Sequence, residues 1–166
     1  VTQIIEDISD ALSGQGFTRL AIANAHLDPA HTSSISAAAA ALHERGGIRV
    51  IYPDVTRKPW ALRLTDEFKS GACHAGQYEG SIVMAARPDL VKRDVQCALP
   101  ENPTSLSVAI REGKDRFEEI GGHRAYFGDP ASATAEEGKE TIRALGQILV
   151  DAIIEAGREG PETGRE

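Results

Sequence analysis

An apolar segment near the start of the chain ends in residues that could bind a metal ion. Residues 19–25 have the short, apolar character of a buried strand, and His26, Asp28 and His31 follow. Side chains alternate along a strand, so His26 and Asp28 would project to one side if the extended geometry persists that far. Open α/β sheets place their ligands at the carboxyl ends of the strands. The spacing His-x-Asp-x-x-His at a strand end predicts a metal-binding or catalytic role for His26 and Asp28, and His31 could contact a substrate or the edge of a metal site.

Structural roles are also open to the same residues. Asp28 precedes Pro29, which is the pattern of a helix N-cap followed by proline at the first helical position. Such a cap does not exclude metal binding. An isolated histidine is more often a hydrogen-bonded structural residue than a ligand, and His31 could simply lie in the first helical turn.

A second pair of residues, His74 and Glu79, could carry protons. They bracket a turn containing Gly76, and a helix is expected to begin around Gln77 and to end before Pro88. At this spacing an imidazole and a carboxylate can face one cavity. The structural alternative is that Gly76 makes the turn, Glu79 interacts with the helix dipole and His74 packs in the fold.

The elements around these residues predict an α/β fold. Apolar periodicity predicts a helix at about residues 2–14, with Thr2 as its cap. An alanine-rich helix that starts at Pro29 separates the first strand from a second strand at residues 48–52. The order helix, strand, helix, strand is typical of a parallel sheet with right-handed crossovers.

The second half of the chain predicts less regular structure before a final helix. Residues 60–69 can form a helix, and residues 92–129 are rich in turn formers and predict irregular structure with short strands. Thr134 is expected to cap the last long helix. Its predicted apolar stripe consists of Ile142, Leu145, Ile148, Leu149 and Ile153. We expect one domain over residues 1–157 and a polar tail at residues 158–166.

The composition excludes several classes of protein. The chain has 166 residues, 41% of them hydrophobic, which suits one compact domain. A formal charge of −7, with no basic stripe, argues against a nucleic-acid partner. No apolar stretch approaches the length needed to span a bilayer and no signal-peptide pattern opens the chain, so we expect a cytoplasmic protein with no membrane partner. Cys73 and Cys97 lie in unrelated contexts and predict no disulfide.

The two polar stretches together resemble the creatininase (creatinine amidohydrolase) family over essentially the whole chain. Asn24-Ala25-His26 with Asp28 is similar to the family's Asn-Gly-His-x-Glu segment, which supplies ligands to a two-metal site. Residues 74–81 are similar to the family's His-Ala-Gly-x-x-Glu-Thr-Ser segment, whose histidine is regarded as a proton-transfer residue. Residues 127–130 and 133–138 resemble the family's approach to its last helix.

This resemblance implies a three-layer αβα sandwich around a mostly parallel sheet. It also implies a metal-dependent amidohydrolase that uses divalent zinc or manganese to cleave a carbon–nitrogen amide bond in a small or cyclic compound. His26 and Asp28 would bind metal, while His74 and Glu79 would act in catalysis. The family further suggests a homo-oligomer with a small-molecule substrate, and its members differ in the substrate they hydrolyse.

Some positions depart from the family's pattern. Ala25 replaces a glycine, Asp28 a glutamate and Gly80 a threonine, and Cys73 stands where creatininase itself has an acidic residue, which argues against creatinine as the substrate. The family's upstream Glu-x-His pair and bridging aspartate have no counterpart here, so we expect the chain to match the C-terminal two thirds of a member. The other function class that the sequence leaves open is a non-catalytic α/β binding or scaffold protein lacking those upstream ligands.

Overall fold

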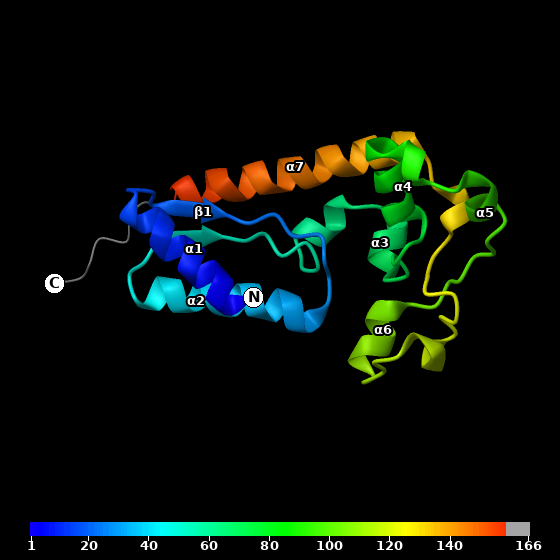
Figure 1. Cartoon of the computed structure of the whole chain (residues 1–166), viewed down its shortest axis with the longest axis horizontal. Helices are drawn as coiled ribbons and strands as arrows, with labels where there is room; N and C mark the ends of the chain where they lie inside the picture. The colour runs from blue at the N-terminus through cyan, green and yellow to red at the C-terminus, as the bar shows by residue number, and fades with distance from the viewer. Residues whose placement is uncertain (159–166) are drawn as a thin grey trace. The chain divides into compact units, whose positions relative to one another are not determined.

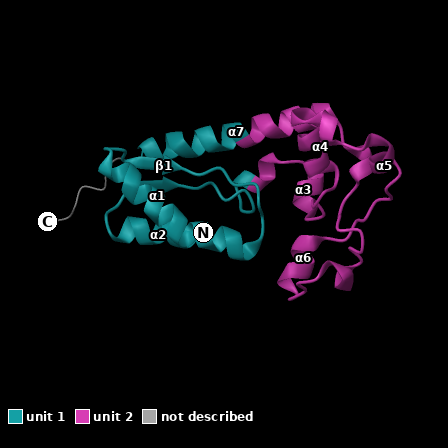
Figure 2. Cartoon of the chain, in the orientation of Figure 1, with its two compact units in different colours: residues 1–60, 146–166 teal, residues 61–145 magenta. Residues whose placement is uncertain are grey.

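The computed structural model describes residues 1–158, which form two compact units. The first contains Val1–Trp60 and the chain from Gly146, and the second contains Ala61–Leu145 (Figure 2). The prediction of a single domain over residues 1–157 stays a prediction. The predicted polar tail lies outside the described residues except for Arg158, which ends the last helix. Within residues 1–158, no helix combines the length and apolar character needed to cross a membrane.

The first unit has the predicted order of helices and strands. Its elements are α1 (Thr2–Gly14), β1 (Arg19–Ala21), α2 (Pro29–Glu44), β2 (Arg49–Ile51) and the C-terminal part of α7 (Ala135–Arg158). The two strands pair in parallel, with Leu20 opposite Val50. The parallel pairing is confirmed, although each strand is only three residues long and therefore shorter than predicted.

Helices cover both faces of this two-stranded sheet. Ile51 packs against Ala152 and Ala156 of α7 on one face, where the small alanines let the helix approach the strands closely. On the other face α2 buries Ile35, Ala38 and Leu42, and α1 packs against α2. Figure 1 shows α7 on one side of the strands and α1 with α2 on the other. The unit therefore has three layers, α, β and α.

The helix ends of this unit show which predictions from local sequence hold. Asp28 caps α2 and Pro29 lies at its first helical position, as expected. Thr2 does not cap α1, because Val1 is the N-cap residue and the Thr2 hydroxyl instead donates to the Ser34 carbonyl, 3.1 Å away. α1 also leaves its apolar side chain Ile4 63% exposed.

The long helix α7 follows its prediction in part. Thr134 caps it by accepting a hydrogen bond from the Glu137 backbone N–H at 3.2 Å. In the predicted stripe Ile148 is buried, but Ile142 and Ile153 are exposed. The buried face continues from Ile148 through the alanines that contact β2, because only small side chains fit between the helix and the strands.

The second unit consists of short helices and the start of α7. They are η1 (Trp60–Arg63), which begins at the boundary, α3 (Asp66–Ser70), α4 (Gln77–Ala86), η2 (Pro88–Leu90), α5 (Arg93–Cys97), α6 (Leu106–Arg111), η3 (Phe117–Ile120) and η4 (Pro130–Ser132), where η marks a 3-10 helix. The predicted α4 is confirmed. The helix predicted over residues 60–69 is instead two, because Thr65 starts α3 by accepting a hydrogen bond from the Phe68 N–H.

The prediction of short strands in residues 92–129 is wrong. This described segment contains short helices, and its only strand-like pairing is an isolated antiparallel bridge between Asn102 and Gly128. Pro100 and Pro103 flank Asn102 in the sequence. Proline has no N–H to donate to a strand ladder, so the bridge has little opportunity to extend into a strand.

Candidate active site

Asn24 organises the first group of predicted site residues. Its Oδ1 accepts a hydrogen bond from the His26 backbone N–H at 3.2 Å, and its Nδ2 donates to the His26 carbonyl at 2.7 Å. The same Oδ1 lies 3.0 Å from Nε2 of His31. The rings of His26 and His31 consequently meet edge to face, with their centroids 5.1 Å apart. The structure thus brings the two predicted histidines together at the end of the segment that follows β1.

Asp28 serves as the helix cap that the sequence allowed. Its Oδ1 accepts a hydrogen bond from the His31 backbone N–H at 3.0 Å, which satisfies one of the free donors in the first turn of α2. The paired strand β1 ends at Ala21, so His26 and Asp28 lie beyond it. Residues 22–28 connect β1 to α2 without regular secondary structure.

The residues of this group do not by themselves fit a complete metal site. A catalytic divalent ion normally takes three protein ligands and leaves a position open for water. Among residues 1–158, no group of three or more His, Cys, Asp or Glu side chains is arranged to hold a metal ion. The assignment of His26 and Asp28 as metal ligands and of His31 as a substrate contact stays a prediction.

His74 and Glu79 lie together in the turn before α4. Nδ1 of His74 is 3.9 Å from Oε2 of Glu79, which is an ion-pair distance, and the two side chains are 42% and 39% exposed. Oε2 of Glu79 also accepts a hydrogen bond from the Ala75 backbone N–H at 2.6 Å. Ala75 has a φ of 51°, a left-handed conformation that alanine rarely adopts. The turn therefore holds an imidazole and a carboxylate side by side where solvent reaches both.

Contacts with Phe127 and Phe117 restrain the backbone and the imidazole ring of His74. Its carbonyl accepts a hydrogen bond from the Phe127 N–H at 2.7 Å, and Phe127 is completely buried. The imidazole ring packs against Phe117 with their centroids 5.1 Å apart, and Phe117 packs in turn against Phe127. The backbone and one face of the imidazole are therefore held by the core of the second unit.

Glu67 is the residue of this site that sequence reasoning missed. Its Oε1 accepts hydrogen bonds from the backbone N–H groups of Gln77 at 2.8 Å and Asp129 at 2.7 Å. Its Oε2 accepts one from the Tyr78 N–H at 2.6 Å. The N-cap residue of α4, Gly76, makes no side-chain capping bond, so the Glu67 carboxylate from α3 performs that function. No local motif predicts this, because the bonded residues lie 10, 11 and 62 positions away.

Burial and negative charge keep the Cys73 thiol protonated. Burial, followed by the carboxylates of Glu79 and Glu67, raises the pKa of Cys73 to about 12. Burial likewise raises the pKa of the Tyr78 hydroxyl. A thiol must ionise to act as a nucleophile, so neither pKa favours attack by these groups at neutral pH. The surroundings therefore disfavour covalent catalysis by Cys73.

Tyr52 is a second residue that the sequence prediction did not include. Its hydroxyl lies 3.5 Å from Nδ2 of Asn24, so it approaches the histidine pair from the carboxyl end of β2. Burial is the main reason that the pKa of Tyr52 is raised, and Asp54 adds to it. The signal that could have found Tyr52 is its place directly after a strand adjacent to β1, where ligands gather in parallel sheets.

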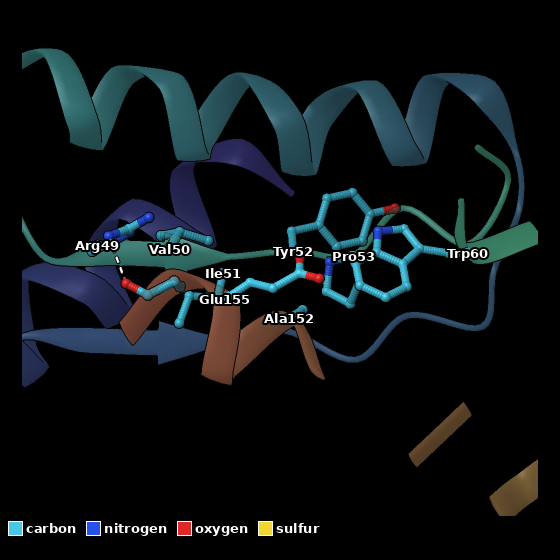
Figure 3. Close-up of a pocket in the computed structure, with 9 residues that line it drawn as sticks. Arg49, Val50, Ile51, Tyr52, Pro53, Trp60, Ala152 and Glu155 are labelled. Atoms are coloured by element: carbon cyan, nitrogen blue, oxygen red, sulfur yellow. Dashed lines mark hydrogen bonds between the residues drawn. The ribbon is translucent and has the colours of Figure 1, made fainter. Parts of the chain in front are cut away.

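Each unit contains a cavity. One of about 180 Å³ lies between β2 and α7 in the first unit, and Figure 3 shows Tyr52, Pro53 and Trp60 together at one end of it. At the other end Arg49 donates a hydrogen bond to the Ala156 carbonyl at 2.9 Å. A second cavity of about 430 Å³ lies in the second unit beside α4. Of the predicted site residues, only Glu79 lines either cavity.

Comparison with solved structures defines the class of fold. A creatininase with a tryptophan-to-phenylalanine substitution matches with a TM-score of 0.65 and 23% identity, over 93% of this chain and 62% of that one. A manganese form of creatininase matches with a TM-score of 0.58 and 21% identity, over 93% and 63% of the two chains. The chain therefore has a creatininase-like α/β fold, as predicted, and it spans about 62% of the length of the first of these structures.

The family model for creatinine amidohydrolase, Creatininase, matches residues 1–153, and the chain belongs to this family. No curated protein matches the chain. The family match covers the N-terminal part of the chain and does not support the expectation that the chain corresponds to the C-terminal two thirds of a member. The two groups of predicted site residues lie in different units of the chain, His26, Asp28 and His31 in the first and His74 with Glu79 in the second.

Proposed function

We propose that the chain carries catalytic residues of a metal-dependent amidohydrolase that cleaves a carbon–nitrogen amide bond in a small or cyclic compound. Membership of the creatininase family supports a hydrolase. The observation that carries the proposal is the pair of His74 and Glu79, whose charged atoms lie 3.9 Å apart in a turn that Glu67 anchors. Amide hydrolysis requires a group that moves a proton from water to the departing nitrogen, and a histidine beside a carboxylate is suited to this task.

The proposed chemistry uses the imidazole twice. His74 accepts a proton from a water molecule while the water oxygen forms a bond to the amide carbon. His74 then donates that proton to the nitrogen as the carbon–nitrogen bond breaks, so the products are a carboxylic acid and an amine. Glu79 stabilises the positive imidazolium between these steps because its carboxylate faces Nδ1, which leaves Nε2 to act on the substrate.

We further propose zinc or manganese as the divalent metal, with His26 and Asp28 among its ligands and His31 near the substrate. The support comes from the relatives, since one similar creatininase structure is a manganese form and another is described as a Zn-Zn type. Because residues 1–158 contain no group of three suitable side chains, this ligand set is incomplete within the part of the chain that the structure describes.

That incomplete ligand set also supports a second candidate function. A non-catalytic α/β binding or scaffold protein would retain the fold without holding a metal. A cytoplasmic location, a homo-oligomeric state and a small-molecule partner remain predictions from the sequence, as does the expectation of no nucleic-acid or membrane partner.

Metal analysis combined with an amidase screen tests the proposal. The purified protein would be supplied with zinc or manganese, assayed on cyclic amides and on N-formyl and N-carbamoyl compounds, and compared with a chelator-treated sample. We expect His74→Ala to lower turnover by about 100-fold or more while bound metal is unchanged. A His74→Ala variant that loses metal would identify His74 as a ligand. An intact protein that binds no metal and hydrolyses no amide would favour the scaffold function.

A further inference from the structure

The cavity beside α4 in the second unit is an open, mostly apolar groove, and the proposed catalytic residue Glu79 lines it. It has a volume of about 430 Å³, within the usual range for small-molecule sites. Glu79 and Gly80, in the first turn of α4, line it together with Val83 one turn further on. Leu90 and Val95 line it from the segment that follows α4. A ligand lying in the groove would therefore touch aliphatic side chains while it reaches the Glu79 carboxylate.

Three aliphatic side chains that line the groove are exposed to water. Leu90 is 61% exposed, Val95 58% and Val83 41%. Single exposed apolar residues are ordinary, but three that line one concave surface are a feature of binding sites. Covering them would be favourable at about 25 cal/mol for each Å² of apolar surface removed from water.

The groove is built on restrained elements. Nη1 of Arg93 donates hydrogen bonds to Oε1 of Gln96 at 2.9 Å and to the Ala133 carbonyl at 3.3 Å, which ties α5 to η4. A Cβ atom on Gly80 would lie 3.1 Å from both Ala133 Cβ and Gln96 Nε2, so this glycine permits close packing at the base of the groove. A preformed groove of this kind binds a ligand with little cost of ordering the protein.

One cationic group is available to the same ligand. Lys92 lines the groove between Leu90 and Val95 in the sequence, and its side chain is exposed. An ammonium group beside an aliphatic wall selects a ligand with both an apolar part and an acid group. The negative Glu79 carboxylate repels the ligand's acid group from its end of the groove. It can instead accept a hydrogen bond from the N–H of an amide.

We propose that this groove binds an N-acyl amino acid with an aliphatic acyl chain. The chain lies against Val83, Leu90 and Val95, the carboxylate pairs with Lys92, and the amide lies at Glu79. This inference rests on the proposed function, because Glu79, which lines the groove, is the carboxylate of the proposed catalytic pair. A substrate of this class differs from that of a general amidase because it needs both the aliphatic acyl chain and the carboxylate.

Calorimetry and NMR chemical shifts measure the binding of N-octanoylglycine, so they test the proposed ligand of the groove without requiring turnover. N-acetylglycine has the same acid with a minimal chain, and N-octanoylglycinamide has the chain without the acid. We expect Leu90→Ala to weaken binding of N-octanoylglycine about tenfold, since it removes apolar contact. We expect Lys92→Met to weaken binding of N-octanoylglycine about fivefold and to leave binding of N-octanoylglycinamide unchanged.

A matched control is available in the same unit. Leu62 is 58% exposed, close to the value for Leu90, and does not line the groove, so Leu62→Ala should leave binding within about twofold. Equal binding of N-acetylglycine, or equal effects of Leu62→Ala and Leu90→Ala, would overturn the proposal. So would a Leu90→Ala variant that abolishes self-association in sedimentation while N-octanoylglycine binds neither protein, because the groove would then be a contact between copies.

The same experiment separates this inference from the proposed function. Binding with the expected pattern, but no hydrolysis of N-octanoylglycine or of any small amide by the protein supplied with zinc or manganese, would support the groove and refute the amidohydrolase. Hydrolysis of small amides without any binding of N-octanoylglycine would support the amidohydrolase and refute the substrate class.

Discussion

The role of Glu67 gives the sharpest test of how the candidate active site is held. Replacing Glu67 with alanine removes the acceptor for three backbone N–H groups, those of Gln77, Tyr78 and Asp129. Each donor left without a partner costs about 1 to 3 kcal/mol when it is shielded from water. Glu67 is only partly buried, so the lower value is appropriate for each donor. We therefore expect Glu67→Ala to reduce the free energy of unfolding by about 3 kcal/mol.

A glutamine at the same position should have a smaller effect. Oε1 of Glu67 accepts two of the three hydrogen bonds, and a glutamine oxygen placed there retains both. The amide nitrogen would face the Tyr78 N–H, so that one bond is lost. We expect Glu67→Gln to cost about 1 kcal/mol, roughly a third of the effect of alanine.

Urea unfolding measures the total effect, and hydrogen exchange locates it. Exchange should accelerate at the amides of Gln77, Tyr78 and Asp129 in Glu67→Ala. Glu101→Ala serves as the control, because Glu101 is an exposed glutamate in a loop of the same unit. Equal stability of the two alanine variants, or unchanged exchange at the three amides, would refute the capping role of Glu67.

Two further perturbations test the surroundings of the candidate site. Cys73 should react with iodoacetamide at pH 9 at least about 100-fold more slowly than the exposed Cys97, since the pKa of Cys73 is raised to about 12. The unfolded thiol ionises near pH 9 while the folded thiol stays protonated, so stability should fall as the pH rises from 9 toward 12. Cys73→Ser should reduce this dependence and leave the part that comes from the raised pKa values of Tyr78 and Tyr52. Asn24→Ala should separate the rings of His26 and His31, and ring-to-ring NOEs between them measure this. NOEs that persist in Asn24→Ala would show that another contact holds the histidines.

Features set by near neighbours in the sequence were predictable. The caps of α2 and α7 use Asp28 and Thr134, and each bonds a backbone N–H three residues further on. The parallel pairing of β1 and β2 was also predictable, because a helix between two apolar segments favours a crossover connection. The His74 and Glu79 pair follows for the same reason, since both residues lie within one turn and the start of one helix.

Features that depend on distant contacts were not predictable. The exposure of Ile153 on α7 depends on which face of the helix the strands meet, and the apolar periodicity of the helix alone does not determine this. The bridge at Asn102 requires Gly128, so it depends on how the intervening residues fold. Glu67 is the clearest case, because its carboxylate reaches Asp129, 62 positions away.

The arrangement of His26 with His31 depends on contacts at the start of α2. An extended chain through Asp28 would have grouped side chains by alternation, which places His26 with Asp28. In the structure β1 ends at Ala21, and Asp28 is the N-cap of α2. His31 then lies in the first turn of that helix, held by Asp28 through its backbone and by Asn24 through its ring. The position of His31 beside His26 therefore depends on the first turn of α2. A change that weakens the Asp28 cap should increase the motion of His31 relative to His26, even if it removes no contact of either ring.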